Sequence, residues 1–165
     1  MSPDPGGVKR AQLLREALQE TTGKDVGFAI LEKRRSAGIV TGDQFAGEVA
    51  GRAVHIVDDM ICGGGTMLRA AAAARSPGAV EVHAIASHGL FTAEVVTRLA
   101  ADGACDTLTV TDSTLPFSVP TEPLSARLRV LASARLFAAA IRETHGGPHL
   151  SGAPHPELVS VDSGH

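Results

Sequence analysis

The chain has 165 residues and a mass of 16.9 kDa, a length typical of a single domain. Its 15 basic and 18 acidic side chains give a net charge of −3, and it contains neither Trp nor Tyr. Both facts argue against binding to nucleic acid or membranes through bulk charge or aromatic stacking. Two cysteines are too few for a disulfide framework, and no apolar run approaches the ~18 residues of a membrane span. We therefore expect a cytoplasmic protein with one domain over residues 1–150 and a flexible Gly-, Pro- and Ser-rich tail over 151–165.

The first third of the chain predicts one helix and two strands. Apolar Ala11, Leu14 and Leu18 recur at helical spacing, which predicts a helix over 9–22. The segments that follow are expected to be a buried strand over 26–31, a mobile charged loop over 32–42 and a short strand over 44–50.

The rest of the chain alternates short apolar segments with helical ones. Strands are predicted over 53–57, 80–86, 108–111 and 128–131, and helices over 66–75, 92–101 and 133–144. This alternation predicts an α/β fold with a mostly parallel sheet flanked by helices, because parallel strands are joined by right-handed crossovers. Ligands of such open sheets bind beyond the carboxyl ends of the strands, so site residues are expected there.

The strongest motif is a strand that ends in two carboxylates and a glycine-rich turn, VDDMICGGGT over 57–66. Consecutive glycines let backbone amides approach an anion, and the start of the next helix adds partial positive charge. No Lys follows the glycines, which excludes a Walker loop. The acids Asp58 and Asp59 repel phosphate and favour hydroxyls or a bound Mg²⁺. The motif therefore predicts a ligand with a diol beside a phosphate, such as a ribose 5-phosphate; a surface turn with solvated acids is the alternative.

Two weaker motifs lie closer to the N-terminus. The segment SPDPGGVKR over 2–10 offers one acid and two glycines before a helix, which makes it a second candidate anion cradle or, equally, a disordered leader. The cations over 33–35 could close over a polyphosphate, although a solvated charge run is the commoner explanation of such a segment.

Together these motifs resemble, in order, the C-terminal half of the ribose-phosphate diphosphokinases. These enzymes make phosphoribosyl pyrophosphate (PRPP) on a type I phosphoribosyltransferase fold. SPDPGGVKRA over 2–11 looks like the family's pyrophosphate loop, 33–35 like its flexible catalytic loop and 57–66 like its ribose-phosphate loop. Three further segments are similar to the family's: SHGLFT over 87–92, TDSTLP over 111–116 and AAAIRETH over 138–145.

The resemblance implies Mg²⁺-dependent transfer of the β,γ-diphosphoryl group of ATP to the anomeric hydroxyl of ribose 5-phosphate. It gives the catalytic role to Lys33 and Arg35. Diphosphate binding falls to Asp4, Gly6 and Gly7, with Asp4 also holding the metal. The ribose phosphate would be bound by Asp58, Asp59, Cys62, Gly63, Gly64, Gly65 and Thr66. The family also implies a homo-oligomer, or a partnership with a longer homologue.

Two features depart from the family pattern. Cys62-Gly63 stands where the family usually has Asp-Thr, so one hydroxyl that would face the phosphate is lost. A charge-assisted hydrogen bond contributes ~1.5–3 kcal/mol, which predicts ribose-phosphate affinity lower by about ten- to a hundredfold. In addition, nothing in the chain corresponds to the family's N-terminal half, which supplies most of the ATP site. The strand that should lead into the Asp4 loop is also missing before Met1, so we expect a sheet without its first strand.

These departures leave three functions open. The chain is a PRPP-synthetase-like domain that is incomplete without an N-terminal half, through a truncated start or a separate partner chain. Alternatively, it is a stand-alone phosphoribosyltransferase that consumes PRPP, or a regulatory subunit with no catalysis of its own.

Overall fold

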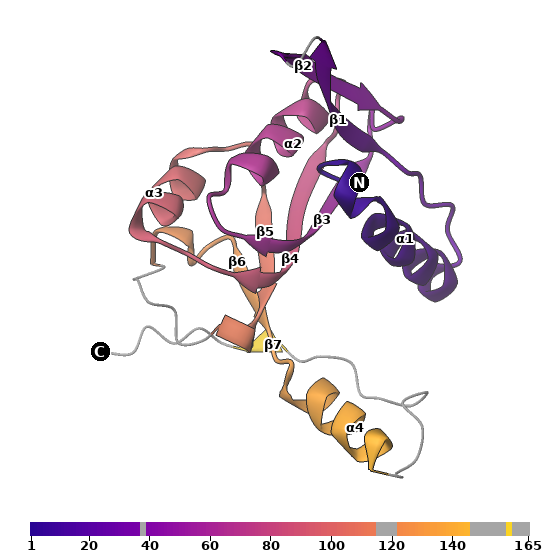
Figure 1. Ribbon diagram of the computed structural model, residues 1–165, viewed down its shortest axis with the longest axis vertical. Helices are drawn as coiled ribbons and strands as arrows, with labels where there is room; N and C mark the ends of the chain where they lie inside the picture. Colours follow the sequence, from indigo (N-terminus) through magenta and orange to yellow (C-terminus); the bar gives the residue numbers. More distant parts are fainter. Residues whose placement is uncertain (37–38, 115–121, 146–157, 160–165) are drawn as a thin grey trace.

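A computed structural model describes residues 1–36, 39–114, 122–145 and 158–159, with the backbone alone over 33–36, 39–42 and 158–159. Its centre is a five-stranded sheet in the order β3-β4-β5-β6-β7, beside a separate two-stranded sheet of β1 and β2 (Figure 1). The parallel strands are β3 (Ala53–Ile61), β4 (Glu81–Gly89), β5 (Thr107–Thr111) and β6 (Leu128–Leu131). The predicted α/β fold with a mostly parallel sheet is confirmed.

The last strand, β7 (Leu158–Val159), pairs antiparallel with β6. It is the only part of the segment over 151–165 that lies within the described residues. The prediction of a flexible tail otherwise falls outside them.

One face of the sheet is closely packed by two helices. Helix α2 (Gly65–Arg75) buries Ala70, Ala71 and Ala74 completely, and its alanines let the helix backbone approach the strands closely. Helix α3 (Ala93–Ala101) buries Val95, Val96 and Leu99 in the same core. The strands contribute Ile56, Val82, Ala84, Leu108, Val110 and Val130. This core fixes the positions of the β3–α2 and β4–α3 connections.

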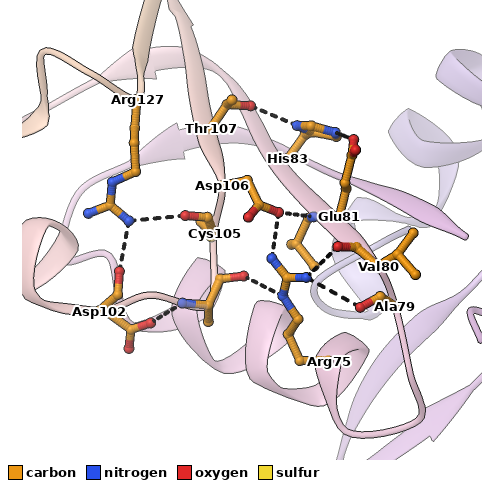
Figure 2. Close-up of polar contacts among 12 residues, drawn as sticks. Arg75, Ala79, Val80, Glu81, His83, Asp102, Cys105, Asp106, Thr107 and Arg127 are labelled. Atoms are coloured by element: carbon orange, nitrogen blue, oxygen red, sulfur yellow. Dashed lines mark hydrogen bonds and ion pairs between the residues drawn. The ribbon is translucent and has the colours of Figure 1, made fainter. Parts of the chain in front are cut away.

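Two arginines form hydrogen bonds to the loops that lead into the amino ends of the strands (Figure 2). The Arg75 guanidinium donates to the Asp106 carboxylate at 2.5 Å and to the Val80 carbonyl at 2.8 Å. The Val82 amide also donates to Asp106, and this bond, helped by Arg75, holds the pKa of Asp106 below its usual value. The Arg127 guanidinium donates to four carbonyls, of Leu99, Ala100, Asp102 and Cys105, at 2.6–3.0 Å.

Helix α1 (Val8–Thr22) lies beside the β3 edge of the sheet (Figure 1) and matches the predicted helix within one residue. It ends at Gly23, whose φ of +64° is the left-handed conformation that favours glycine. Only Ala11 of its 15 residues is buried. The helix is therefore much less embedded than α2.

The segment after α1 differs from the prediction. Strand β1 (Ile30–Ser36) and strand β2 (Ile39–Ala46) pair antiparallel as a hairpin. The loop predicted over 32–42 is therefore wrong for 32–36 and 39–42, whereas residues 37–38 lie outside the described part of the chain. The strands predicted over 26–31 and 44–50 are displaced. A hairpin is held by main-chain hydrogen bonds, which tolerate charged side chains; the charge-rich composition was therefore misleading.

Two residues occupy the place of the expected missing strand. Ser2 pairs in parallel with Ile30 of β1, and Met1 is hydrogen-bonded to β3. The main sheet and the hairpin are thus joined through Met1 and Ser2.

Helix α4 (Ala134–Thr144) follows β6 and points away from the sheet (Figure 1). The Asp112 carboxylate, in η2 (Asp112–Thr114), accepts hydrogen bonds from the amide and hydroxyl of Ser133 at the helix start. Leu136, Phe137 and Ile141 are at least half exposed. No helix in the described ranges is long and apolar enough to cross a membrane.

Candidate functional site

The turn from β3 into α2 lines a cavity of about 430 Å³ at the carboxyl edge of the sheet. Its walls include Asp58 and Asp59 of β3, the residues from Cys62 to Thr66, and two arginines, Arg69 and Arg98. Every predicted ribose-phosphate residue therefore lies in this one cavity.

The cavity floor is the glycine turn itself. Gly64 has a φ of +70°, and a Cβ added there would lie 3.3 Å from the Leu99 side chain, so both conformation and space favour glycine. Gly64 is also the N-cap of α2, where no side chain caps the first amides. Uncapped amides at the start of an 11-residue helix suit an anion such as phosphate. Thr66 follows within the first turn, where its hydroxyl can add a further hydrogen bond.

The two arginines reach the cavity from different helices. Arg98 of α3 donates to the Gly63 carbonyl at 3.0 Å and to Glu94 at 2.7 Å. The Arg69 Nε is shielded from solvent and finds no hydrogen-bond partner among the described residues, and it lies 3.5 Å from the Asp43 carboxylate of β2. Sequence reasoning missed both residues. Arg69 follows Gly65 by one helical turn and could have been found from that spacing, whereas only the packing of α3 reveals Arg98.

A third arginine holds the carboxylate pair. Arg10 Nη1 lies 2.9 Å from Asp58 Oδ1, and Nη2 lies 3.3 Å from Asp59 Oδ2. Burial raises the pKa of Asp58, and the charge of Asp59 adds to this, while the Asp59 amide and Arg10 oppose it. The strand does not end at these acids as predicted but continues to Ile61, because the ladder with β4 extends to Gly89. Arg10 was in a quoted motif but was given no role.

The predicted diphosphate loop is folded tightly. Asp4 precedes η1 (Pro5–Gly7), and its Oδ1 accepts a hydrogen bond from the Gly7 amide at 3.0 Å. Gly7 is buried, and a Cβ there would come within 2.7 Å of Ser2 Oγ. The loop is thus ordered rather than a disordered leader. Helix α1 carries Arg10 from this loop to the carboxylates of the cavity, which links the two predicted subsites.

The predicted catalytic cations lie on the hairpin. Lys33 stands opposite Asp43 in the β1–β2 register, and Arg35 stands opposite Val40, past a bulge. Asp43 in turn lies near Arg69 of the cavity. The backbone therefore brings Lys33 to the strand pair that borders the cavity at the glycine turn; the catalytic roles of Lys33 and Arg35 remain predictions.

The two other strand-end segments are linked by hydroxyl groups. His88 Nδ1 lies 2.7 Å from Ser113 Oγ, and the Thr111 hydroxyl donates to the Ser87 carbonyl at 2.7 Å. These contacts hold the ends of β4 and β5 together at the site edge. Residues 115–116 of the second segment lie outside the described part of the chain.

Comparison with known proteins identifies the family. Residues 37–152 match the family described as "Phosphoribosyl synthetase-associated domain". The chain belongs to this family. It is 41% identical over 143 residues to a ribose-phosphate pyrophosphokinase of Pasteurella multocida, covering 86% of this chain and 43% of that protein. A Prochlorococcus marinus ribose-phosphate pyrophosphokinase is 36% identical over 146 residues, covering 88% and 42%.

A solved structure supports the same assignment. The phosphoribosylpyrophosphate synthetase of Mycobacterium smegmatis superposes with a TM-score of 0.65 at 29% identity, over 87% of this chain and 43% of that one. The chain spans less than half the length of the relatives it matches. The resemblance to a PRPP-synthetase-like partial domain is confirmed.

Proposed function

We propose that the chain provides the ribose-phosphate half of a ribose-phosphate pyrophosphokinase site and acts in the cytoplasm together with a second domain that completes the ATP site. The observation that carries the proposal is the uncapped glycine turn at Gly64, beside the Asp58–Asp59 pair and the arginines of one cavity. An anion cradle next to two carboxylates fits a sugar phosphate better than a phosphate alone.

The cavity suggests how ribose 5-phosphate would lie. The 5-phosphate would meet the amides from Gly63 to Thr66, with Arg69 and Arg98 beside them, and the ribose hydroxyls would reach Asp58 and Asp59. Because Arg10 already contacts both acids, it would set their orientation before the sugar binds. In the reaction, the anomeric oxygen forms a bond to the β-phosphorus of ATP and releases its proton to solvent. The bond between the β-phosphorus and the oxygen that bridges to the α-phosphorus breaks, so that AMP leaves with this oxygen and the bonding electron pair.

Magnesium fits the acidic groups that face the proposed diphosphate. Mg²⁺ prefers oxygen ligands and is commonly held by one or two carboxylates together with substrate phosphates. Asp4 uses Oδ1 to cap Gly7 and leaves Oδ2 for a metal. Within the described ranges no three His, Cys, Asp or Glu side chains cluster as a metal site, which fits a metal held mainly by the diphosphate. The metal would supply charge neutralisation, while Lys33 and Arg35 would stabilise the transferring group.

Calorimetric titration of the full chain with ribose 5-phosphate tests the proposal. We expect saturable binding that is weakened about tenfold or more in Asp58→Asn/Asp59→Asn, because both hydroxyl acceptors lose their charge. Glu16→Gln is the matched control, since Glu16 is an exposed acid on α1 away from the cavity. Equal affinity in all three proteins, or no binding to the unaltered chain, would contradict the proposal. PRPP binding tighter than ribose 5-phosphate would instead favour a phosphoribosyltransferase.

A further inference from the structure

Arg69 differs from the other arginines near the glycine turn because its hydrogen-bond donors are unused. Arg10 contacts both carboxylates of the cavity. Arg98 donates to the Gly63 carbonyl and to Glu94. The Arg69 guanidinium, by contrast, donates no hydrogen bond to a described residue, and its Nε is shielded from solvent. Since a guanidinium carries five N–H donors, Arg69 retains donors for a ligand in the cavity.

The Arg69 side chain lies between the glycine turn and the β1–β2 hairpin. Arg69 follows Gly65, the first residue of α2, by four residues, so both stand on one face of the helix. Helical side chains lean toward the N-terminus of their helix, which directs Arg69 back toward the turn. On its other side, Arg69 Nε lies 3.5 Å from Oδ2 of Asp43 in β2, where the hairpin approaches α2 (Figure 1). Arg69 therefore borders both the cavity and the hairpin.

Asp43 stands on the face of the hairpin that packs against the core. Strand residues alternate between faces, so Asp43 shares a face with Phe45, which packs partly buried against the core. Leu31, opposite Phe45 in the register, is buried. Asp43 lies two residues from Phe45 toward the hairpin tip and stands opposite Lys33. Among the side chains that the structure describes, Asp43–Arg69 is the only ion pair between the hairpin and the rest of the chain.

The Asp43–Arg69 pair is partly withdrawn from solvent. The two side chains are 28% and 35% exposed, and salt screens such a pair less than a fully exposed one. A guanidinium is planar and can donate along two edges, each of which matches a carboxylate or a phosphate. Arg69 can therefore donate to Asp43 and to an anion in the cavity at the same time.

We propose that Arg69 bridges the Asp43 carboxylate and a phosphate bound at the glycine turn, so that phosphate binding and the position of the hairpin stabilise each other. The inference rests on the proposed function only for the position of the phosphate. Asp43 is a positioning residue, because it acts on the phosphate through Arg69. Since Lys33 stands opposite Asp43, a bound phosphate fixes the main chain that carries Lys33. The coupling is reciprocal: the factor by which Asp43 strengthens phosphate binding is the factor by which phosphate stabilises the docked hairpin.

Titration of the full chain with inorganic phosphate, followed by amide NMR, tests the bridge. This probe needs only the phosphate site and is independent of sugar recognition. We expect Arg69→Met to weaken phosphate binding about tenfold, because a charged donor is lost. Asp43→Asn should weaken it about fivefold, because Arg69 loses the carboxylate that orients it. The double variant should bind phosphate as Arg69→Met does, since Asp43 acts only through Arg69.

Glu32→Gln is the matched control for charge. Glu32 is an exposed acid of β1, one register pair from Asp43 and on the opposite face of the hairpin. Its substitution removes the same charge and should leave phosphate affinity unchanged. Unaltered or tighter phosphate binding in Asp43→Asn would show that Asp43 does not orient Arg69 and would overturn the inference.

Amide hydrogen exchange of β1 and β2 gives a readout that a merely structural ion pair would not change. Saturating phosphate should slow this exchange about fivefold in the unaltered chain and leave it unchanged in Asp43→Asn and Arg69→Met. Arg69→Lys keeps the positive charge but lacks the two-edged donor group, so it should retain part of the phosphate affinity and lose the effect on exchange. Far-UV circular dichroism verifies that each variant folds.

A parallel titration with ribose 5-phosphate separates this inference from the proposed function. If phosphate binds and slows hairpin exchange while ribose 5-phosphate binds no more tightly, the bridge is supported and the sugar-phosphate assignment is wrong. If ribose 5-phosphate binds tightly but neither ligand changes hairpin exchange, the bridge is wrong and the proposed function stands. A phosphate effect that persists in Arg69→Met contradicts the bridge, and binding of neither ligand contradicts both proposals.

Discussion

The two edges of strand β3 differ in their main-chain pairing and in how closely a helix packs beside them. Toward β4 it is paired in register from Ala53 to Ile61, and α2 covers that part of the sheet with five buried residues. Toward β1, Met1 alone among the described residues hydrogen-bonds to the main chain of β3, and α1 buries a single residue. The well-packed side positions the glycine turn, whereas on the other side the start of β3 and the apolar side chains of α1 line an open groove. The cavity at the glycine turn and the groove beside α1 therefore lie at opposite ends of one strand.

Truncating one leucine on each side of β3 should give the largest difference in the free energy of unfolding. Leu108→Ala removes a fully buried β5 side chain and should lower the free energy of unfolding by about 2–5 kcal/mol. Leu14→Ala on α1 should lower it by less than about 1 kcal/mol, because Leu14 borders an open groove. Urea denaturation measures both. Similar losses would mean that the two sides are equally packed.

The second-largest loss in the free energy of unfolding is expected from removing the Arg127 guanidinium. Arg127→Met leaves four carbonyls at the end of α3 and before β5 without their donor, which predicts a loss of about 2–4 kcal/mol in the free energy of unfolding. Arg129→Met, on the neighbouring exposed side chain of β6, should change it by less than ~0.5 kcal/mol. Equal effects in urea denaturation would show that the network on the packed side does not stabilise the fold.

We expect the Met1 amino group, at the edge of β3 that faces β1, to make the free energy of unfolding depend on pH. Burial lowers the pKa of the Met1 amino group to about 6 from 8.0, so the folded chain binds fewer protons than the unfolded chain between these values. Stability should therefore rise as pH increases from 6 to 8, by on the order of 2 kcal/mol. Burial, with His83 and Met1 nearby, also lowers the pKa of His55, which adds a rise in the same direction at the acidic end.

Thermal melts across this pH range provide the measurement. Chemical acetylation of Met1 removes the titrating amine and should flatten the rise between pH 7 and 8. An unchanged slope after acetylation would assign the dependence to another group.

The smallest expected effect is the difference in stability between alanine substitutions at two glycines of the turn. Gly64→Ala should destabilise the fold by about 1–2 kcal/mol, because its φ of +70° and the nearby Leu99 both oppose a Cβ. Gly63→Ala should cost less than ~0.5 kcal/mol, since a Cβ there meets nothing within 4 Å. Thermal melts of the two variants compare them directly; equal melting temperatures would contradict the geometry of the turn.

The sequence predicted the packed side more successfully than the open side. Strands β3–β6 and helices α2 and α3 were located because apolar runs and glycine stops report on burial directly. The hairpin was missed because charged side chains conceal a strand whose stability comes from main-chain pairing. Arg98 and Arg10 were missed as site residues because their contacts with the turn and the carboxylates arise only when separate helices pack together. The order of the motifs, by contrast, was sufficient for the family.

We propose above that the turn from Cys62 to Thr66 binds the phosphate of a sugar phosphate. Amide NMR of the full chain during titration with ribose 5-phosphate tests it most directly. We expect saturable shifts concentrated at Gly63, Gly64, Gly65 and Thr66, with little change at Leu14 or Phe28, which line the groove beside α1. Absent shifts in the turn, or shifts confined to the groove, would contradict it.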